Sequence, residues 1–203
     1  MKNLCTSAWQ HSLGTALLLA FVGACYHYVQ ADSLNVYAVN RIIADVALLL
    51  IGYSIAVGAL VKWWGIGTTT IAYRREYGVL GFALALLHGV LTFALPRFSL
   101  TGLLLPENIV GFGAAVISLT LLTIMTAVSV AWIKNTIGML WWRRTLSIGI
   151  YAYGFGLLHA VIKSVDVWSY ASWHQAGLPP LSLFVCGAAS AMFFVWWFAR
   201  FVR

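Results

Sequence analysis

Six apolar runs occupy most of this 203-residue chain and limit it to one kind of fold. A helix needs roughly 20 apolar residues to cross the hydrocarbon of a bilayer, and each run is close to that length. In lipid the backbone N–H and C=O groups must pair within the protein, which a helix achieves along its own length. We therefore predict six transmembrane helices, at residues 13–29, 42–62, 77–95, 108–133, 146–163 and 181–199.

The composition agrees with an all-α membrane protein formed by a single transmembrane domain over residues 1–203. The chain is 62% hydrophobic and 8% charged, whereas soluble domains average about 25% charged residues. The runs leave no soluble domain large enough for a flavin or a nucleotide. The net charge of +7 does not indicate nucleic-acid binding, because the basic residues lie at the ends of the predicted helices. No Cys-x-x-Cys-His motif is present, which excludes covalent haem attachment of the c type.

The basic residues also predict an orientation. One side of the membrane receives nine of them, and the other side receives only Arg41, Arg97 and Lys163. Basic residues are enriched in cytoplasmic loops, so both termini are expected in the cytoplasm. The nine are Lys2, Lys62, Arg74, Arg75, Lys134, Arg143, Arg144, Arg200 and Arg203.

Two histidines lie inside the predicted spans. His88 follows Arg75 by 13 residues in the third span, and His159 follows Arg144 by 15 residues in the fifth. These separations correspond to roughly 20 and 22 Å along a helix. Both spans start on the same side, so the two imidazoles are expected at a similar depth in the outer half of the bilayer. An ionisable residue in lipid is costly and suggests a function.

A shared ligand would explain the matching depth of His88 and His159, and the iron of one b-type haem is the candidate that we favour. The alternative is a structural hydrogen bond across helices. Zinc is less favoured because the sequence offers no third and fourth ligand at that depth. Small residues on both spans would admit a flat macrocycle, or would simply let membrane helices pack closely; they are Gly78, Gly81, Ala83 and Ala85, and Gly149, Ala152, Gly154 and Gly156.

Polar residues near the outer ends of the spans are secondary candidates. Arg41 and Arg97 are the expected partners of the haem propionates, with ordinary snorkelling to the interface as the alternative. His27 and His174 could hydrogen-bond a propionate or a quinone, although an interfacial histidine is more often only solvated. Asp45 is the main charged residue inside the spans.

The residues around the two histidines resemble the ferric reductase-like transmembrane domain family, and within it the MsrQ/YedZ type of haem-binding membrane subunit. The resemblance rests on two segments: Arg-Arg-Glu-Tyr-Gly at 74–78 running to Leu-His at 87–88, and Trp-Arg-Arg-Thr-Leu-Ser at 142–147 running through Tyr151 to Leu-His at 158–159. It covers approximately residues 40–163. The outer spans match only in number and hydropathy.

This resemblance implies a four-helix core in which His88 and His159 ligate the outer b haem, in a bacterial inner-membrane protein. It also implies electron transfer from quinol or a flavin reductase to a periplasmic reductase. The sequence departs from the family at the inner haem site, where Ser147 replaces a histidine and Arg75 falls at the corresponding inner position. That departure favours a membrane quinol as the electron donor.

The expected function is therefore electron transfer through one bis-histidine haem b, from quinol to an outer, periplasmic acceptor or partner protein, in a subunit of an oxidoreductase. A haem-free scaffold subunit with the same fold is the alternative. A small transporter is a third possibility, which the near-absence of charge inside the spans disfavours.

Overall fold

The computed structural model describes residues 2–31, 33–95, 104–130, 136, 138, 140–142, 144–145, 147–168 and 177–201. These residues form α-helices and short 3₁₀ turns, and none of them lies in a strand. The prediction of an all-α fold is confirmed for this part of the chain. The elements are α1 (Lys2–Ala31), α2 (Val36–Trp64), η1 (Ile71–Tyr73), α3 (Arg74–Ala94), α5 (Pro106–Val128), α7 (Gly149–Ser164), η2 (Val165–Trp168) and α9 (Leu181–Phe201).

Five segments of these helices are long and apolar enough to cross a membrane: residues Ser7–Gln30, Val36–Trp64, Ile71–Ala94, Asn108–Val128 and Leu181–Ala199. They correspond to five of the six predicted spans. The remaining predicted span, 146–163, overlaps α7, whose described length is 16 residues. Most of the helices begin or end a few residues beyond the predicted apolar runs. α2, for example, starts at Val36, where Asn35 caps it through a 2.9 Å hydrogen bond from the Ala38 amide.

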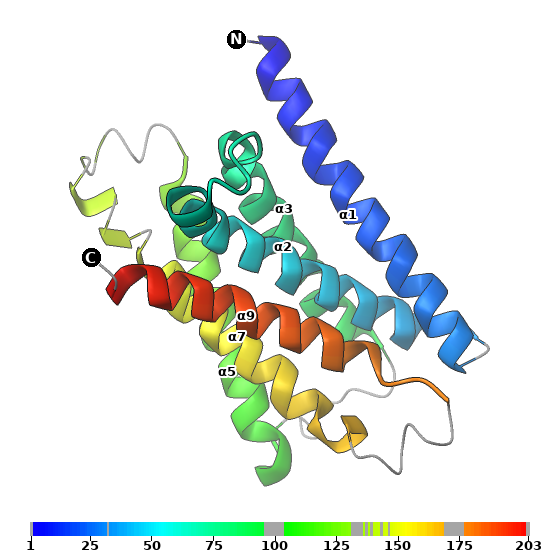
Figure 1. The fold of residues 1–203 in the computed structure, drawn as a ribbon. Coiled ribbons are helices and arrows are strands. Elements are labelled where there is room, and N and C mark those ends of the chain that lie inside the picture. The colour runs from blue at the N-terminus through cyan, green and yellow to red at the C-terminus, as the bar shows by residue number, and fades with distance from the viewer. Residues whose placement is uncertain are drawn as a thin grey trace.

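Helix α2 is the centre of the bundle (Figure 1). Of its most apolar window, 67% is buried, against 11–22% for the windows of the four other spans. It packs most closely against α3 and α9, while α5 and α7 form a second tight pair. α1 lies along the outside of the bundle, mainly against α2 and α3.

Two apolar clusters meet on α2. One joins it to α1 and α3 through Ala16, Ile42, Val46, Leu50 and Tyr77. The other joins it to α5, α7 and α9, with Leu48, Ile51, Ile55, Leu122, Ile150, Ala152, Tyr153, Val185 and Ala189. Because α2 contributes to both clusters, it holds α1 and α3 on one side and α5, α7 and α9 on the other.

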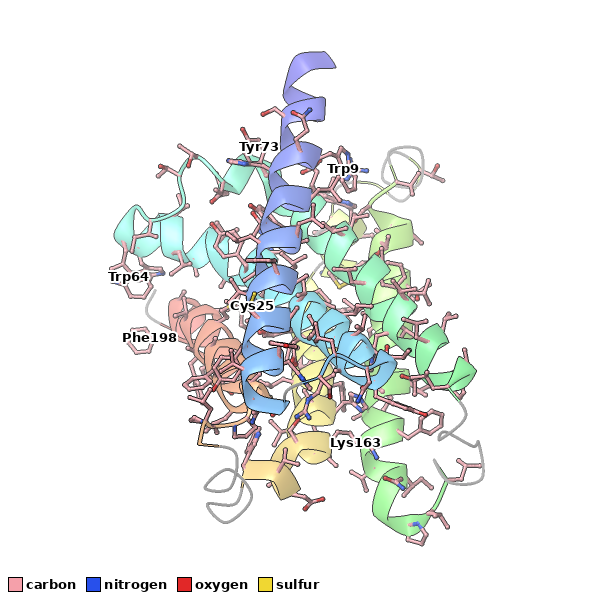
Figure 2. The ribbon with its side chains drawn as sticks, turned by 90° about the vertical axis from the view of Figure 1, so that its right-hand side faces the viewer. Trp9, Cys25, Trp64, Tyr73, Lys163 and Phe198 are labelled. Carbon is pink, nitrogen blue, oxygen red and sulfur yellow. The ribbon has the colours of Figure 1, made fainter. Side chains whose placement is uncertain are left out.

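The two ends of the bundle carry different residues. Figure 2 shows Trp9 and Tyr73 toward one end, and Lys163 toward the opposite end. α2 ends at the first of these with Trp63 and Trp64, and the ammonium of Lys62 lies 5.4 Å from the centre of the Trp63 ring. Gly65 then closes the helix in the left-handed conformation (φ 66°), which glycine adopts without steric cost.

The packing of α2 against α7 brings the Tyr153 side chain into close contact with Gly52. A Cβ atom at this position would lie 2.2 Å from Tyr153 Oη and 2.9 Å from Met192 Sδ. Tyr153 is 2% exposed, and its hydroxyl donates a 3.1 Å hydrogen bond to the Ala189 carbonyl of α9. The tyrosine therefore connects α7 to α9 across the surface of α2, in space that only glycine leaves open.

We predict that Gly52→Ala lowers the thermal stability of the detergent-solubilised protein, by about 1–3 kcal/mol, because the added methyl group overpacks this contact. Thermal unfolding followed by circular dichroism measures the effect. Gly14→Ala is the matched control, since no atom lies within 4 Å of the added Cβ there. Adding Tyr153→Phe to Gly52→Ala removes the closest atom and should restore part of the loss. Equal stability of the two alanine variants would contradict this account.

Candidate functional site

The structure brings together the two histidines that the sequence singles out. His88 of α3 and His159 of α7 have ring centres 6.5 Å apart, with an angle of 58° between the ring planes. Both side chains are half-buried. α3 and α7 are not among the helix pairs that pack closely in the described part of the chain. The two rings therefore approach each other from helices whose backbones stay apart.

Helix α2 holds the ring of His88. Its Nδ1 lies 3.1 Å from the backbone carbonyl oxygen of Asn40 and 3.0 Å from the Asn40 side-chain oxygen. The Asn40 amide nitrogen donates to Thr92 Oγ1 at 3.0 Å, and that hydroxyl donates to the His88 carbonyl at 2.8 Å. Because the amide nitrogen is used for Thr92, the amide oxygen of Asn40 is turned toward the imidazole.

Helix α5 holds the ring of His159. Its Nδ1 lies 2.9 Å from the backbone carbonyl oxygen of Gly111. The pairing of α5 with α7 that makes this contact possible is close: the Ser118 hydroxyl donates to the Ala152 carbonyl at 2.8 Å, and Gly149 approaches the Met125 side chain. Nearby, Lys163 donates a hydrogen bond to the side-chain oxygen of Asn108. Each histidine is thus fixed by a neighbouring helix rather than by the other histidine.

These contacts determine which nitrogen of each ring is available. A carbonyl oxygen only accepts hydrogen bonds, so Nδ1 carries the proton in both rings, and Nε2 of the neutral imidazole keeps its lone pair. Within the described part of the chain, neither Nε2 atom has a hydrogen-bond partner. A ring nitrogen bonded to a carbonyl is the usual arrangement behind a metal-ligating histidine, since it fixes the ring and raises the basicity of the ligating atom.

The spacing of the two rings suits one metal ion between them. Two imidazoles on opposite sides of an ion place their ring centres about 6.4 Å apart, given about 2 Å from metal to nitrogen and about 1.2 Å from nitrogen to ring centre. The observed separation is 6.5 Å. No third His, Cys, Asp or Glu joins the pair among the described residues. His88 and His159 are therefore the residues that would hold a metal ion here, and iron in a porphyrin is one that needs only two ligands from the protein.

The glycines expected to make room for a macrocycle have another role. Added Cβ atoms at Gly78 and Gly81 would lie 3.0 Å from Ser54 Oγ and 2.7 Å from Ile51 Cγ1, both of α2. Those at Gly149 and Gly156 would meet Met125 and Ser118 of α5. These four glycines let the helices pack closely, as the alternative interpretation proposed, because each faces a neighbouring helix at short range.

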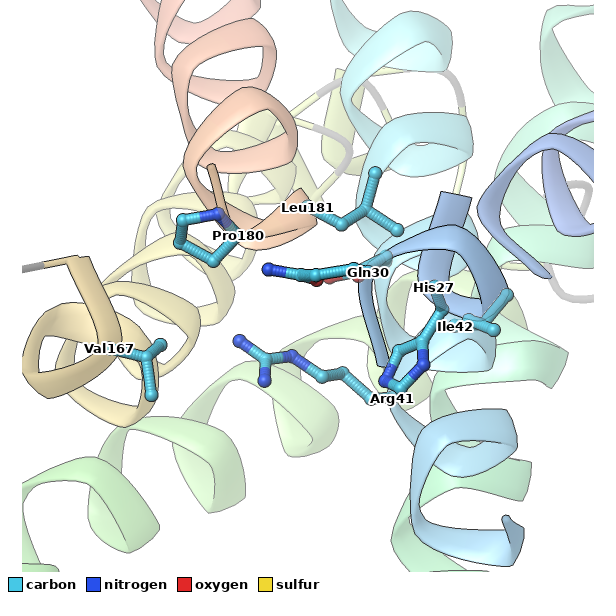
Figure 3. A pocket seen from close by; sticks show the side chains of 8 residues that line it. His27, Gln30, Arg41, Ile42, Val167, Pro180 and Leu181 are labelled. Atoms are coloured by element: carbon cyan, nitrogen blue, oxygen red, sulfur yellow. The ribbon is translucent and has the colours of Figure 1, made fainter. Parts of the chain in front are cut away.

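Arg41 lies in a separate cavity next to the histidine pair. Its guanidinium donates to Ser182 Oγ at 2.8 Å and to Ser164 Oγ at 3.5 Å. Figure 3 shows the side chains of Arg41 and Gln30 reaching toward Val167 and Pro180. The cavity has a volume of about 170 Å³ and is lined by His27, Gln30, Arg41, Ile42, Asp45, Val167, Pro180 and Leu181. Among the described residues, Arg41 thus donates hydrogen bonds to hydroxyl groups. The expected hydrogen bond from Arg41 to a haem propionate stays a prediction.

Other residues named by the sequence are differently placed. Arg97 and His174 lie outside the described residues. His27 lines the same cavity as Arg41.

Sequence reasoning missed Asn40 and Gly111, which hold the two imidazoles. Asn40 could have been noticed as a polar residue directly before Arg41, but Gly111 acts through its backbone, and no side-chain pattern reports that.

Comparisons with known proteins add no assignment: no protein-family model matches the chain, and no curated protein matches its sequence. The resemblance to the ferric reductase-like family therefore rests on the short segments around the two histidines.

We predict that both imidazoles of the haem-free protein carry their proton on Nδ1 at neutral pH. Nitrogen NMR of histidine-labelled protein distinguishes protonated from unprotonated ring nitrogens. Asn40→Ala should alter the ring signals of His88 and leave those of His159 unchanged, because Gly111 still accepts the second hydrogen bond. The signals are assigned with single histidine substitutions. Protonated Nε2 atoms on both rings would contradict the arrangement described above.

Proposed function

We propose that this chain is a membrane cytochrome that carries one haem b between His88 and His159 and transfers electrons through it. The observation that supports this proposal best is the pair of imidazoles, with ring centres 6.5 Å apart and both Nδ1 atoms bonded to carbonyl groups. When bound, the haem supplies one-electron chemistry at its iron. His88 and His159 would hold the iron, and the helices behind them would fix the orientation of the two rings in an apolar surrounding.

Within this proposal the chain crosses the membrane six times, with α7 as part of the fifth span. The lengths of the five apolar helices support a membrane location. The nine-to-three distribution of basic residues supports an orientation with both termini in the cytoplasm of a bacterial cell. The protein would then be a distant member of the ferric reductase-like family, of the MsrQ/YedZ type, in the inner membrane.

The expected depth of the two histidines suggests how electrons pass. From Arg75 to His88 is roughly 20 Å along α3, and the sequence has Ser147 and Arg75 where the family has the ligands of an inner haem. A single haem in the outer half is far from a cytoplasmic reductase and close to the outer surface. We therefore propose a membrane quinol as donor, and an outer acceptor or partner protein.

We predict that the purified protein from haem-replete cells shows a Soret band and a reduced-minus-oxidised spectrum of b type, with a stoichiometry of one haem per chain. His88→Ala and His159→Ala should each abolish this spectrum, because a single imidazole leaves one axial position without its ligand. His11→Ala is the control, since His11 is exposed on α1 and contacts Tyr73 instead.

A wild-type preparation without a Soret band would contradict the proposal and favour the haem-free scaffold, for which the replacement of the family histidine by Ser147 is the supporting observation. Retention of a full spectrum in both alanine variants would show that the haem lies elsewhere.

We also predict that Asn40→Ala keeps the haem and raises its midpoint potential, by on the order of tens of millivolts. The side-chain oxygen of Asn40 accepts from His88 Nδ1 and increases the electron density on Nε2, which favours ferric iron. Its loss is only partly offset by the backbone carbonyl of the same residue. Potentiometric titration measures the shift, and Thr120→Ala, in an exposed helical position of α5, should leave the potential unchanged.

A further inference from the structure

The cavity beside Arg41 contains buried polar atoms that the fold leaves without partners. His27 Nδ1 and Asp45 Oδ2 are both buried, and neither has a hydrogen-bond partner in the described part of the chain. Both residues line the cavity. A buried polar group without a partner costs free energy, so each such group calls for an explanation, such as a bound molecule.

The walls of this cavity are well defined. Tyr26 of α1 donates a 2.7 Å hydrogen bond to the Pro179 carbonyl, and the Gln30 side chain lies 3.4 Å from the carbonyls of Leu178 and Pro179. On the opposite side, Ser182 Oγ accepts from Arg41 at 2.8 Å and from Trp168 Nε1 at 3.0 Å. These bonds join α1, α2, η2 and α9 around one space, so the cavity is built by four elements of the fold.

The lining indicates the chemistry of a ligand. Arg41 offers donors, Asp45 offers an acceptor, and His27 can do either. One cation and one carboxylate suit a neutral molecule that both donates and accepts hydrogen bonds. The apolar residues Ile42, Val167, Pro180 and Leu181 would contact a flat ring. A volume of about 170 Å³ is several times the share of one water in the liquid, about 30 Å³, so the cavity can hold more than a single water.

We propose that this cavity binds the head group of a membrane quinol or quinone, with His27 and Asp45 as the groups that accept its protons and Arg41 as the donor to its oxygen. Of the neutral rings with polar substituents, a quinol is the one that is dissolved in the bilayer and carries electrons. The choice of a quinol as the ligand rests on the proposed electron-transfer function, whereas the existence of a binding site rests on the cavity.

Arg41 links the cavity to the two helices next to the histidine pair, α2 and α7. Arg41 follows Asn40, whose carbonyl groups accept from His88. Its guanidinium also contacts Ser164, five residues after His159 on α7, which is roughly 7.5 Å along that helix.

The reaction that this arrangement supports is the oxidation of the quinol. Its two O–H bonds break, and its hydroxyl oxygens become the carbonyl oxygens of the quinone. One proton would go to the Asp45 carboxylate and the other to a ring nitrogen of His27. The two electrons would leave one at a time to ferric iron held by His88 and His159, in the function proposed above, with re-oxidation of the iron by the outer acceptor between the two transfers.

Photolabelling with an azido-benzoquinone, on the full chain in lipid nanodiscs, tests the site. Label is expected on peptides that contain Ile42–Asp45 or Pro180–Leu181, and an excess of unlabelled benzoquinone should remove it. Val167→Trp should reduce labelling to background because the indole fills the cavity, whereas Val167→Ala should retain it. Val167 is exposed on η2, so neither variant disturbs the apolar clusters.

A second measurement tests whether the polar groups of the cavity contribute to the binding affinity. Calorimetric titration with a short-chain benzoquinol should show roughly 10–100-fold weaker binding for Asp45→Leu, which removes a charged acceptor. Asp166→Leu, at an exposed position of η2, should bind as the wild type does. Label spread over the lipid-facing surface, or labelling of the cavity unchanged by Val167→Trp, would overturn the site.

The same labelling in the His88→Ala/His159→Ala protein distinguishes this inference from the proposed function. Retained labelling is expected, because the two histidines do not line the cavity. A protein with a b-type spectrum and no label in the cavity overturns the quinol site alone. A protein with the label and no haem overturns the proposed function and leaves the binding site supported.

Discussion

Two hydrogen bonds, from His88 to Asn40 of α2 and from His159 to Gly111 of α5, determine what the centre of this protein can do. An imidazole in an apolar interior needs a partner for its N–H group, and a backbone carbonyl satisfies that need without adding charge. Because each ring uses Nδ1 for this bond, its basic nitrogen, Nε2, has no hydrogen-bond partner among the described residues. Had the two histidines bonded to each other, one of these lone pairs would be used.

The packing of the helices keeps the two rings at this distance. α3 rests on α2 through Gly78 and Gly81, and α7 rests on α5 through Gly149 and Gly156. Each histidine thus belongs to a tightly packed pair of helices, and the separation between the rings is the separation between the two pairs. α2 connects the pairs through its two apolar clusters, so substitutions at the Gly52 contact would be felt at the site without touching either histidine.

The sequence predicted the helical class and five of the spans, because long apolar runs depend on local chemistry alone. It singled out His88 and His159, but their approach depends on which helices pack together, and only the fold shows that. The sequence did not identify Asn40 or Gly111 as partners, since these contacts join residues 48 positions apart and one uses only the backbone. The role of the glycines stayed open for a similar reason. The sequence shows that a helix carries small residues, but only the fold shows which neighbouring helix packs against them.

Arg41 lines the cavity and directly follows Asn40, the residue that accepts a hydrogen bond from His88. Asn40 and Arg41 are adjacent on α2, yet they serve different sides, because successive residues of a helix point about 100° apart. Asn40 faces α3 and accepts a hydrogen bond from His88 Nδ1. Arg41 faces α7 and α9, where it donates hydrogen bonds to Ser164 and Ser182. A molecule that moves the Arg41 side chain would therefore act on the residue directly after Asn40, which is the hydrogen-bond acceptor of His88.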